Sequence, residues 1–343
     1  MHRIDSRVTL AASESPSRDA KALADAYRRF ADEEVRGRSP LYETITRSIA
    51  DDPDVLALLT ALPPPKRQPN LLLAAVRHVA GVPQDWPAFR RIVCSRWNEV
   101  RATMLSHSTQ TNEPGRCATL LPVFARLPQP LALIEVGASA GLCLLPDRYS
   151  YSCGQHLVQA DDATGGTPVF PCQTSPGTPL PRAMPGIVWR AGLDLNPLDV
   201  NNEEQMAWLD TLVWPEDIDR AERLKKAVRI ARADPPRVLR GDLRDGVAAL
   251  AAEAPKDATL VVFHTAVLGY LPSRTDRDAF AASVSTLCNY WISNEAPRVI
   301  SGIAARAPAQ GRAGWFILAV NGEPVAWTAP HGTALEWMGE LPD

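Results

Sequence analysis

The spacing of hydrophobic residues changes near the end of the first third of the chain. Before that point apolar residues recur at helical spacing, as at Leu23, Tyr27 and Phe30. This spacing predicts helices over 20–36, 42–50, 55–62, 70–80 and 86–105. We therefore expect a helical N-terminal domain over residues 1–125.

After residue 125 the apolar residues gather in short runs, each of which ends in polar residues and precedes a helical segment. The runs predict strands over 131–136, 187–194 and 290–295, and at the starts of 237–250 and 258–270. Strands that alternate with helices are typical of a mostly parallel, doubly wound sheet. We expect an α/β domain over residues 126–343.

Two further segments complete the predicted α/β domain. Asn321-Gly322 lies between two apolar runs in 314–328, which predicts an antiparallel hairpin at the end of the sheet. Residues 150–185 are rich in Gly, Pro and Thr and show little periodicity. We expect an insertion there, with short strands around 156–159 and 167–170.

A turn of small residues follows the first predicted strand. Gly137, Ser139 and Gly141 precede a predicted helix over 142–149, and such a turn lets backbone N–H groups approach a ligand closely. Glu135, at the end of the strand, can accept hydrogen bonds from that ligand. Ligands of doubly wound sheets bind outside the carboxyl ends of the strands. The polar side chains predicted at this edge are Glu135, Asp194, Asp242, His264 and Glu295.

A polar segment also precedes the apolar helix before the first strand. Its hydrogen-bonding side chains are Thr109, Gln110, Thr111, Asn112, Glu113 and Arg116. One interpretation is a helix cap made by Thr111 or Asn112. The other is a wall of a binding site, because a cap accounts for only part of the segment. Both interpretations stay open.

Composition narrows the possible partners. The net charge of −3 gives no electrostatic reason to expect nucleic acid or an anionic membrane as a partner. No apolar run reaches the roughly 18 residues of a membrane-spanning helix, and the first 30 residues lack the apolar core of a signal peptide. The six cysteines lack metal-binding spacing. We expect reduced thiols, a cytoplasmic location and no metal.

Three short motifs resemble those of S-adenosylmethionine-dependent methyltransferases: EVGASAG at 135–141, GLDLNP at 192–197 and GDL at 241–243. The resemblance implies a Rossmann-like methyltransferase sheet with S-adenosylmethionine as cofactor. Two departures are the absence of a third glycine in the turn and the long segment between the first two motifs. The implied cofactor-binding residues are Glu135, Gly137, Ser139, Gly141, Asp194, Asn196, Asp242 and Leu243.

A closer resemblance covers roughly residues 20–337. The motifs TQTNE at 109–113, EVGASAGL at 135–142, GLDLNPLD at 192–199, VWPE at 213–216 and WISNE at 291–295 resemble a bacterial domain-of-unknown-function family. That family is thought to have a methyltransferase-like fold. The resemblance implies the fold but brings no established reaction.

These observations lead to a main hypothesis and two alternatives. The main hypothesis is a methyltransferase that acts on a small-molecule acceptor, with Glu295, His264 or Glu113 as general base. The residues expected to contact the acceptor are Thr109, Gln110, Asn112, Arg116 and Asn294. The first alternative is a non-catalytic protein that binds a nucleotide or metabolite on the same fold. The oligomeric state stays open.

The second alternative is a serine hydrolase. Residues 137–141 read G-x-S-x-G, the pattern of a nucleophile elbow, in which Ser139 would be the nucleophile. Asp242 or Glu295, followed by His331, would complete a triad in the chain order of α/β-hydrolases. Against this interpretation, a hydrolase needs several strands before the elbow, and residues 1–130 are predicted to be helical.

Overall fold

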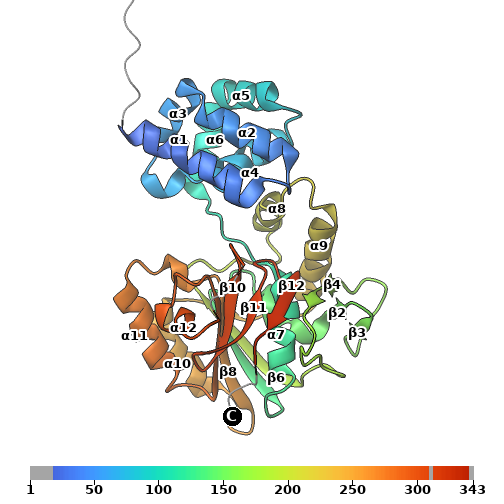
Figure 1. Ribbon diagram of the computed structural model, residues 1–343. Coiled ribbons are helices and arrows are strands. Elements are labelled where there is room, and N and C mark those ends of the chain that lie inside the picture. Colours follow the sequence, from blue (N-terminus) through green and yellow to red (C-terminus); the bar gives the residue numbers. More distant parts are fainter. Residues whose placement is uncertain (1–17, 309–311, 340–343) are drawn as a thin grey trace, which may run out of the picture. The chain divides into compact units, whose positions relative to one another are not determined.

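The computed structural model describes residues 18–308 and 312–339. The chain forms two compact units (Figure 1). The first comprises Met1–Thr109 with Trp214–Glu216, and the second comprises Gln110–Val213 with Asp217–Asp343. Residues 1–17 belong to the predicted helical domain and to the segment expected to lack a signal peptide. They lie outside the described residues.

The first unit is helical, as the apolar spacing predicts. Its helices are α1 (Arg18–Phe30), α2 (Pro40–Ala50), α3 (Pro53–Thr60), α4 (Pro69–Ala80), α5 (Trp86–Ser95) and α6 (Trp97–Ser106), with a π-helical turn over Ala31–Val35. Side chains of Ser39, Asp52 and Asp85 accept hydrogen bonds from the first turns of α2, α3 and α5. The helix predicted over 86–105 is divided in two at Arg96.

Trp214 joins the core of the helical unit from a distant part of the sequence. Its ring packs edge-on against Phe30 and Tyr42, and its indole N–H donates to Asn70 at 3.1 Å. The guanidinium of Arg38 lies over the same ring, 4.5 Å from its centre. Residues 214–216 therefore belong to this unit although the segments on either side belong to the other.

The second unit is built on a nine-stranded sheet. Its strands are β1 (Leu131–Val136), β5 (Gln173–Thr174), β6 (Ile187–Asp194), β7 (Val238–Arg240), β8 (Thr259–Thr265), β9 (Tyr290–Glu295), β10 (Phe316–Val320), β11 (Glu323–Thr328) and β12 (Ala334–Trp337). The spatial order is β5-β12-β11-β10-β9-β8-β1-β6-β7. The pairs from β7 to β9 are parallel, and β10 and β11 form the predicted antiparallel hairpin. The α/β class and the mostly parallel sheet are confirmed.

Helices cover both faces of this sheet (Figure 1). Helices α7 (Cys117–Phe124), α8 (Glu203–Thr211) and α9 (Ile218–Ala233) pack with Leu131 and Leu133 of β1. Helices α10 (Leu243–Glu253), α11 (Arg274–Val284) and α12 (Ser301–Ala304) pack with Ala132 and Ile134. We call these the α7 face and the α10 face. Because side chains alternate along a strand, each β1 residue contributes to only one of them.

The insertion forms a small sheet of its own. Strands β2 (Ser150–Cys153), β3 (His156–Val158) and β4 (Val169–Pro171) pair in the order β3-β2-β4. Two of these strands lie where short strands are predicted. Directly after β4 the chain enters β5, which pairs with β12 at the edge of the large sheet. The insertion is thus connected to the large sheet at both ends.

Two features differ from the predictions. The helix predicted over 142–149 does not form, and two single 3₁₀ turns, Leu142–Leu144 and Pro146–Arg148, stand in its place. Pro146 has no N–H to donate and would cost an α-helix one hydrogen bond, a cost that α7 bears at Pro122. The unit boundary lies at 109/110 instead of 125/126, because the apolar side of α7 is buried against the sheet.

Throughout the described part of the chain, no helix has the length and apolarity needed to span a membrane.

Candidate functional site

The alternation of side chains divides the predicted edge residues between the two faces of the sheet. In β1, Glu135 is two residues beyond Leu133, so its side chain points to the same side of the sheet as Leu131 and Leu133, the α7 face. On β6, Ala191 and Leu193 face α10, which places Asp194 on the α7 face. On β8, Val262 faces α10 and so does His264. The α7 face of the carboxyl edge therefore carries Glu135 and Asp194 together, without His264.

Asp194 holds the turn that follows β1. One carboxylate oxygen, Oδ2, accepts the backbone N–H of Ser139 at 2.8 Å. The other, Oδ1, accepts the N–H of Asn196 at 2.7 Å and the side-chain amide of Gln110 at 3.1 Å. Asp194 is partly exposed. A carboxylate has about four acceptor positions, so one remains in this arrangement and a second becomes available if the Gln110 side chain moves.

Glu135 lies beneath this turn and is 2% exposed. Its Oε2 atom is buried and has no hydrogen-bond partner. Burial raises the pKa of Glu135 well above its usual value, and Cys143 and Asp194 act in the same direction while Arg116 opposes them. The fold therefore favours the neutral, protonated carboxyl, which has an unused oxygen.

Arg116 brings a buried positive charge to the same face. The residue is 8% exposed, and its guanidinium donates to the carbonyl oxygens of Pro330 and Thr265 at 2.9 and 3.0 Å and to the Thr265 hydroxyl at 3.2 Å. Among the described residues no carboxylate forms an ion pair with it. A buried guanidinium without an ionised partner is a favourable position for an anionic group of a ligand.

Glu113 is the acid of the polar segment that precedes α7. Its Oε1 accepts the N–H of Gly115 at 3.0 Å, so Glu113, and not Thr111 or Asn112, caps the turn at the start of α7. Its Oε2 pairs with Arg220 of α9. Burial alone would raise the pKa of Glu113, but Arg220 and the more distant His331 outweigh it and hold the pKa below its usual value. Glu113 is thus an ionised, paired carboxylate.

His264 and Glu295 form a separate network on the α10 face. The Nδ1 atom of His264 lies 2.8 Å from Oε1 of Glu295, and its Nε2 accepts the indole N–H of Trp291 at 3.0 Å. The same Glu295 oxygen accepts the backbone N–H groups of Val267 and Leu268 at 2.7 and 3.0 Å. His264 is fully buried. Both its ring nitrogens are engaged, so neither is available to a ligand in this arrangement.

The glycines of the turn meet protein atoms. A Cβ added at Gly137 would lie 2.4 Å from the Val267 side chain, and one added at Gly141 would lie 2.6 Å from Pro236. Both glycines have positive φ, at 71° and 72°. These glycines are explained by backbone conformation and close packing within the protein. Without the predicted α-helix, the turn also lacks a helix N-terminus that could bind an anion.

The sequence profile of a family described as "Uncharacterized protein conserved in bacteria (DUF2332)" matches residues 24–337, most of the chain. The chain belongs to this family. No curated protein and no solved structure matches it. The family membership agrees with the closer of the two resemblances and supplies no reaction.

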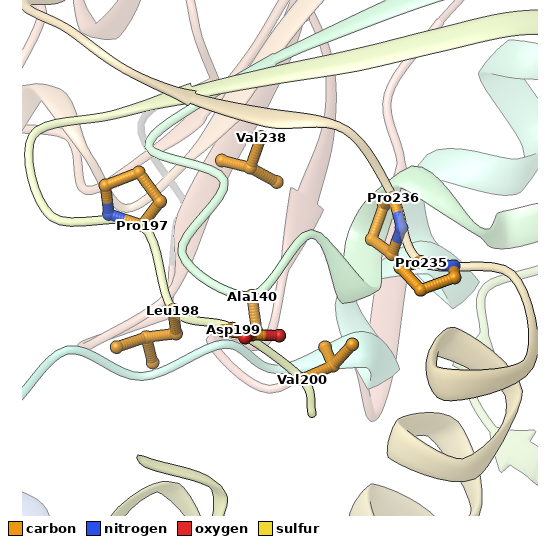
Figure 2. Close-up of a pocket in the computed structure, with 8 residues that line it drawn as sticks. All are labelled: Ala140, Pro197, Leu198, Asp199, Val200, Pro235, Pro236 and Val238. Atoms are coloured by element: carbon orange, nitrogen blue, oxygen red, sulfur yellow. The ribbon is translucent and has the colours of Figure 1, made fainter. Parts of the chain in front are cut away.

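In this DUF2332 chain a pocket of about 240 Å³ lies beside the turn, also on the α7 face (Figure 2). Ala140 of the turn forms one wall of the pocket. The loop after Asp194 and the segment before β7 form the other walls. The other lining residues are Pro197, Leu198, Asp199, Val200, Pro235, Pro236 and Val238. Asp199 is the single charged side chain among apolar ones, but polar atoms form as much of the exposed lining as apolar atoms do.

The remaining predicted site residues of this DUF2332 chain make contacts within the protein. Asp242 caps α10 and pairs with Arg244, which lowers its pKa to about 2. Leu243 packs into the core of the α10 face. Thr109 belongs to the helical unit, where it donates to Gln68. Asn112 accepts the N–H of Leu142, and Asn294 accepts the Thr328 hydroxyl.

Ser139 does not lie in a hydrolase arrangement. Its φ of 53° is unusual for a residue other than glycine, as expected of a nucleophile elbow. However, its Oγ is buried without a hydrogen-bond partner, so no histidine is positioned to take its proton. Within residues 18–308 and 312–339, no group of three or more His, Cys, Asp or Glu side chains could hold a metal ion.

Three residues near the site were not predicted from the sequence. Thr265 accepts a hydrogen bond from Arg116, Cys143 lies beside Glu135, and Arg220 pairs with Glu113. Thr265 follows His264 at the end of a predicted strand, so its place at the edge could have been noted. Arg220 lies in a helix with many charges, and nothing in that pattern distinguishes it.

Proposed function

We propose that the α/β unit is an S-adenosylmethionine-dependent methyltransferase that acts on a small-molecule acceptor. The observation that carries the proposal is the placement of Glu135 and Asp194 at the ends of adjacent strands, on one face, with the small-residue turn between them. The strand order β7-β6-β1-β8-β9 reverses its direction next to β1, where doubly wound sheets bind their ligands. A finer Rossmann-like methyltransferase fold is part of this proposal.

The donor set fits this cofactor. Asp194 can accept hydrogen bonds from ribose hydroxyls, using its remaining acceptor position and the one that Gln110 holds. The unpartnered Oε2 of Glu135 can accept from an ammonium group, and Arg116 can pair with a carboxylate. These two side chains together match the amino-acid end of the cofactor. We propose that the pocket beside Ala140, which apolar side chains and Asp199 line, holds its aromatic base.

One feature restricts how the ligand can lie. Val267 fills the space beside Gly137, so the protein itself occupies that side of the turn. The sulfonium of the bound cofactor supplies an already activated methyl group. The task left to this chain is to orient the acceptor and exclude water. Glu295 and His264 hold the loop that carries Val267, which makes them positioning residues in this proposal.

The test is isothermal titration calorimetry of the full chain with S-adenosylmethionine and S-adenosylhomocysteine. An Asp194→Asn variant should bind about 10- to 150-fold more weakly, since a hydrogen bond to a charged group contributes roughly 1.5–3 kcal/mol. Asp245→Ala, at an exposed acid in the first turn of α10, is the matched control and should bind as the wild type does. Absence of binding of either ligand to the wild type would refute the proposal.

The proton balance gives a second, independent readout. If an ammonium group binds at Glu135, the carboxyl has to release its proton, so the apparent binding enthalpy should depend on the ionisation enthalpy of the buffer. Glu135→Gln should abolish that dependence. Binding without any proton release in the wild type would assign Glu135 no role in the cofactor site.

A second candidate is a non-catalytic protein that binds the same kind of ligand. The observation in its favour is that each general base expected from the sequence is engaged within the protein: His264 and Glu295 with each other, and Glu113 with Arg220. Incubation with methyl-labelled cofactor and a panel of small metabolites separates the two. Binding without transfer of label to any member of the panel would favour the second candidate.

A further inference from the structure

Two cysteines of the insertion lie opposite each other on neighbouring strands. The parallel pairing of β2 with β4 joins Ser150 to Val169 and Ser152 to Pro171, a constant offset of nineteen residues. The same offset places Cys153 opposite Cys172. The backbone N–H of Cys172 donates to the carbonyl oxygen of Ser152 at 2.9 Å, so the strands stay paired at this point.

This arrangement suits a disulfide. Neighbouring strands lie about 4.8 Å apart, and the Cα atoms of disulfide-linked cysteines are usually about 4.4–6.8 Å apart. Directly opposed residues also point to the same side of a sheet. Each of the two thiols shifts the pKa of the other, as expected of neighbouring groups. A covalent bond between them therefore needs little movement of the backbone.

The two thiols differ in access and in acidity. Cys153 is partly exposed, whereas Cys172 is 2% exposed. The neighbouring Cys172 thiol lowers the pKa of Cys153, although burial opposes this, and the neighbouring Cys153 thiol together with burial raises the pKa of Cys172. Cys153 is therefore the better nucleophile of the two, because the thiolate is the reactive form.

We propose that Cys153 and Cys172 form a reversible disulfide by exchange with a low-molecular-weight disulfide. The thiolate of Cys153 attacks the external disulfide, forms a mixed disulfide and releases one thiolate. Cys172 then loses its proton and attacks the Cys153 sulfur, which expels the second external thiolate. The two protein thiols are oxidised by two electrons, and one external disulfide is reduced to two thiols.

The bond would affect more than the small sheet. Cys172 directly precedes β5, whose Gln173 donates to the carbonyl oxygen of Thr333 beside β12. A disulfide would therefore connect the insertion covalently to the segment that forms the edge of the large sheet. It would also close the loop over residues 154–171. We infer that oxidation restricts the motion of the insertion relative to that edge.

The chain offers its own controls for access and for pairing. Cys117 and Cys143 also lie close together, since the Cys117 thiol donates to the Cys143 carbonyl oxygen at 3.6 Å, but they are 0% and 1% exposed. Proximity alone should not make this second pair react, because an external disulfide cannot reach either sulfur. Cys94 is exposed and lies in α5, outside the insertion. It should form a mixed disulfide with the external thiol.

The test uses the full chain in buffers with increasing ratios of oxidised to reduced glutathione. Samples are quenched with an alkylating reagent and analysed as intact protein and as peptides. We expect a loss of about 2 Da that is assigned to a cross-link between the Cys153 and Cys172 peptides. The glutathione ratio at which half of the protein is cross-linked should be the same whether the experiment starts from oxidised or from reduced protein.

Two variants assign the roles of the cysteines. Cys172→Ser should hold Cys153 as a stable mixed disulfide, and Cys153→Ser should leave Cys172 unmodified. Circular dichroism of both variants checks that the fold is retained. A mixed disulfide that persists on Cys153 in the wild type, or a cross-link that forms only after unfolding, would overturn the proposal. The outcome does not depend on whether the protein binds S-adenosylmethionine.

Discussion

Replacement of Glu135 by glutamine tests the unusual state of this carboxyl group. The side chain is 2% exposed, one of its oxygens has no partner, and burial raises its pKa well above the usual value. Glutamine has nearly the same shape, but its side chain does not titrate in this pH range. The comparison of Glu135→Gln with the wild type therefore isolates the contribution of the titration to stability.

The sign of the effect follows from linkage. Below pH about 4.3, the ordinary pKa of a glutamate, both the folded and the unfolded chain hold the proton. As the pH rises above that value, the unfolded chain releases the proton while the fold keeps it, so the free energy of unfolding decreases. The slope is at most about 1.4 kcal/mol per pH unit, and it ends where the pH passes the folded-state pKa of Glu135.

We therefore expect the free energy of unfolding of Glu135→Gln to rise relative to the wild type between pH 5 and pH 8. The limiting value over that interval is about 4 kcal/mol, from the slope of about 1.4 kcal/mol per unit. Urea unfolding at each pH unit measures the difference, and hydrogen exchange of peptides from β1 identifies the transition of the α/β unit. If the substitution also changes the free energy of unfolding by a constant amount at every pH, the slope of the difference against pH is unaffected.

The matched control is Glu203→Gln, at an exposed glutamate in the first turn of α8. Its difference from the wild type should stay within about 0.5 kcal/mol at every pH. Parallel stability curves for Glu135→Gln and the wild type would refute the reasoning. They would mean that the carboxyl is ionised in the fold and that a partner for Oε2 exists.

Three further substitutions test separate parts of the structure. Glu113→Gln should cost the α/β unit about 3–5 kcal/mol at pH 7 by removing the partner of Arg220. Because the pKa of Glu113 is lowered despite burial, that stability is present above pH about 4.3 and is lost as the pH falls through the folded-state pKa. A pH-independent cost in urea unfolding would contradict the ion pair. Both Gly332 and Gly154 have positive φ, which costs an alanine about 1–2 kcal/mol. Only at Gly332 would the new Cβ also lie 1.9 Å from a backbone oxygen, so Gly332→Ala should lower the stability in thermal unfolding by more than Gly154→Ala does. Trp214→Ala should cost the helical unit about 3–5 kcal/mol, with hydrogen exchange of β1 unchanged.

Much of the fold could be predicted because the relevant signals are local. The apolar runs that gave the strands at 131–136, 187–194 and 290–295 need no knowledge of the rest of the chain. The Asn-Gly turn of the β10–β11 hairpin is also local, since it depends on two residues that tolerate positive φ. The helix expected over 142–149 did not form, and Pro146 in the middle of that segment disfavours it by removing one of its hydrogen bonds.

The candidate site could be predicted only in part because its residues meet through register. The sequence placed Glu135, Asp194, His264 and Glu295 at one edge of the sheet. A shift of one residue in a strand moves a side chain to the other face, and no local pattern fixes that choice for polar residues at strand ends. The structure therefore separates His264 from Glu135, although both follow apolar runs of similar length.

This separation limits the chemistry of the proposed methyl transfer. On the α7 face, burial holds Glu135 in its neutral form and Glu113 pairs with Arg220. Asp194 already accepts three hydrogen bonds. No strong, unpaired base among these three carboxyls is ready to take a proton from an acceptor.

The proposed reaction therefore favours acceptors that are nucleophilic without deprotonation by the protein, such as carboxylates or thiolates. A panel of labelled methyl acceptors tests this directly. Carboxylates should be methylated at a rate that is flat between pH 6 and pH 8, since such acceptors are fully ionised in that range. Methylation of alcohols in preference to carboxylates would show that the protein supplies a base, and it would overturn this assignment of Glu113, Glu135 and Asp194.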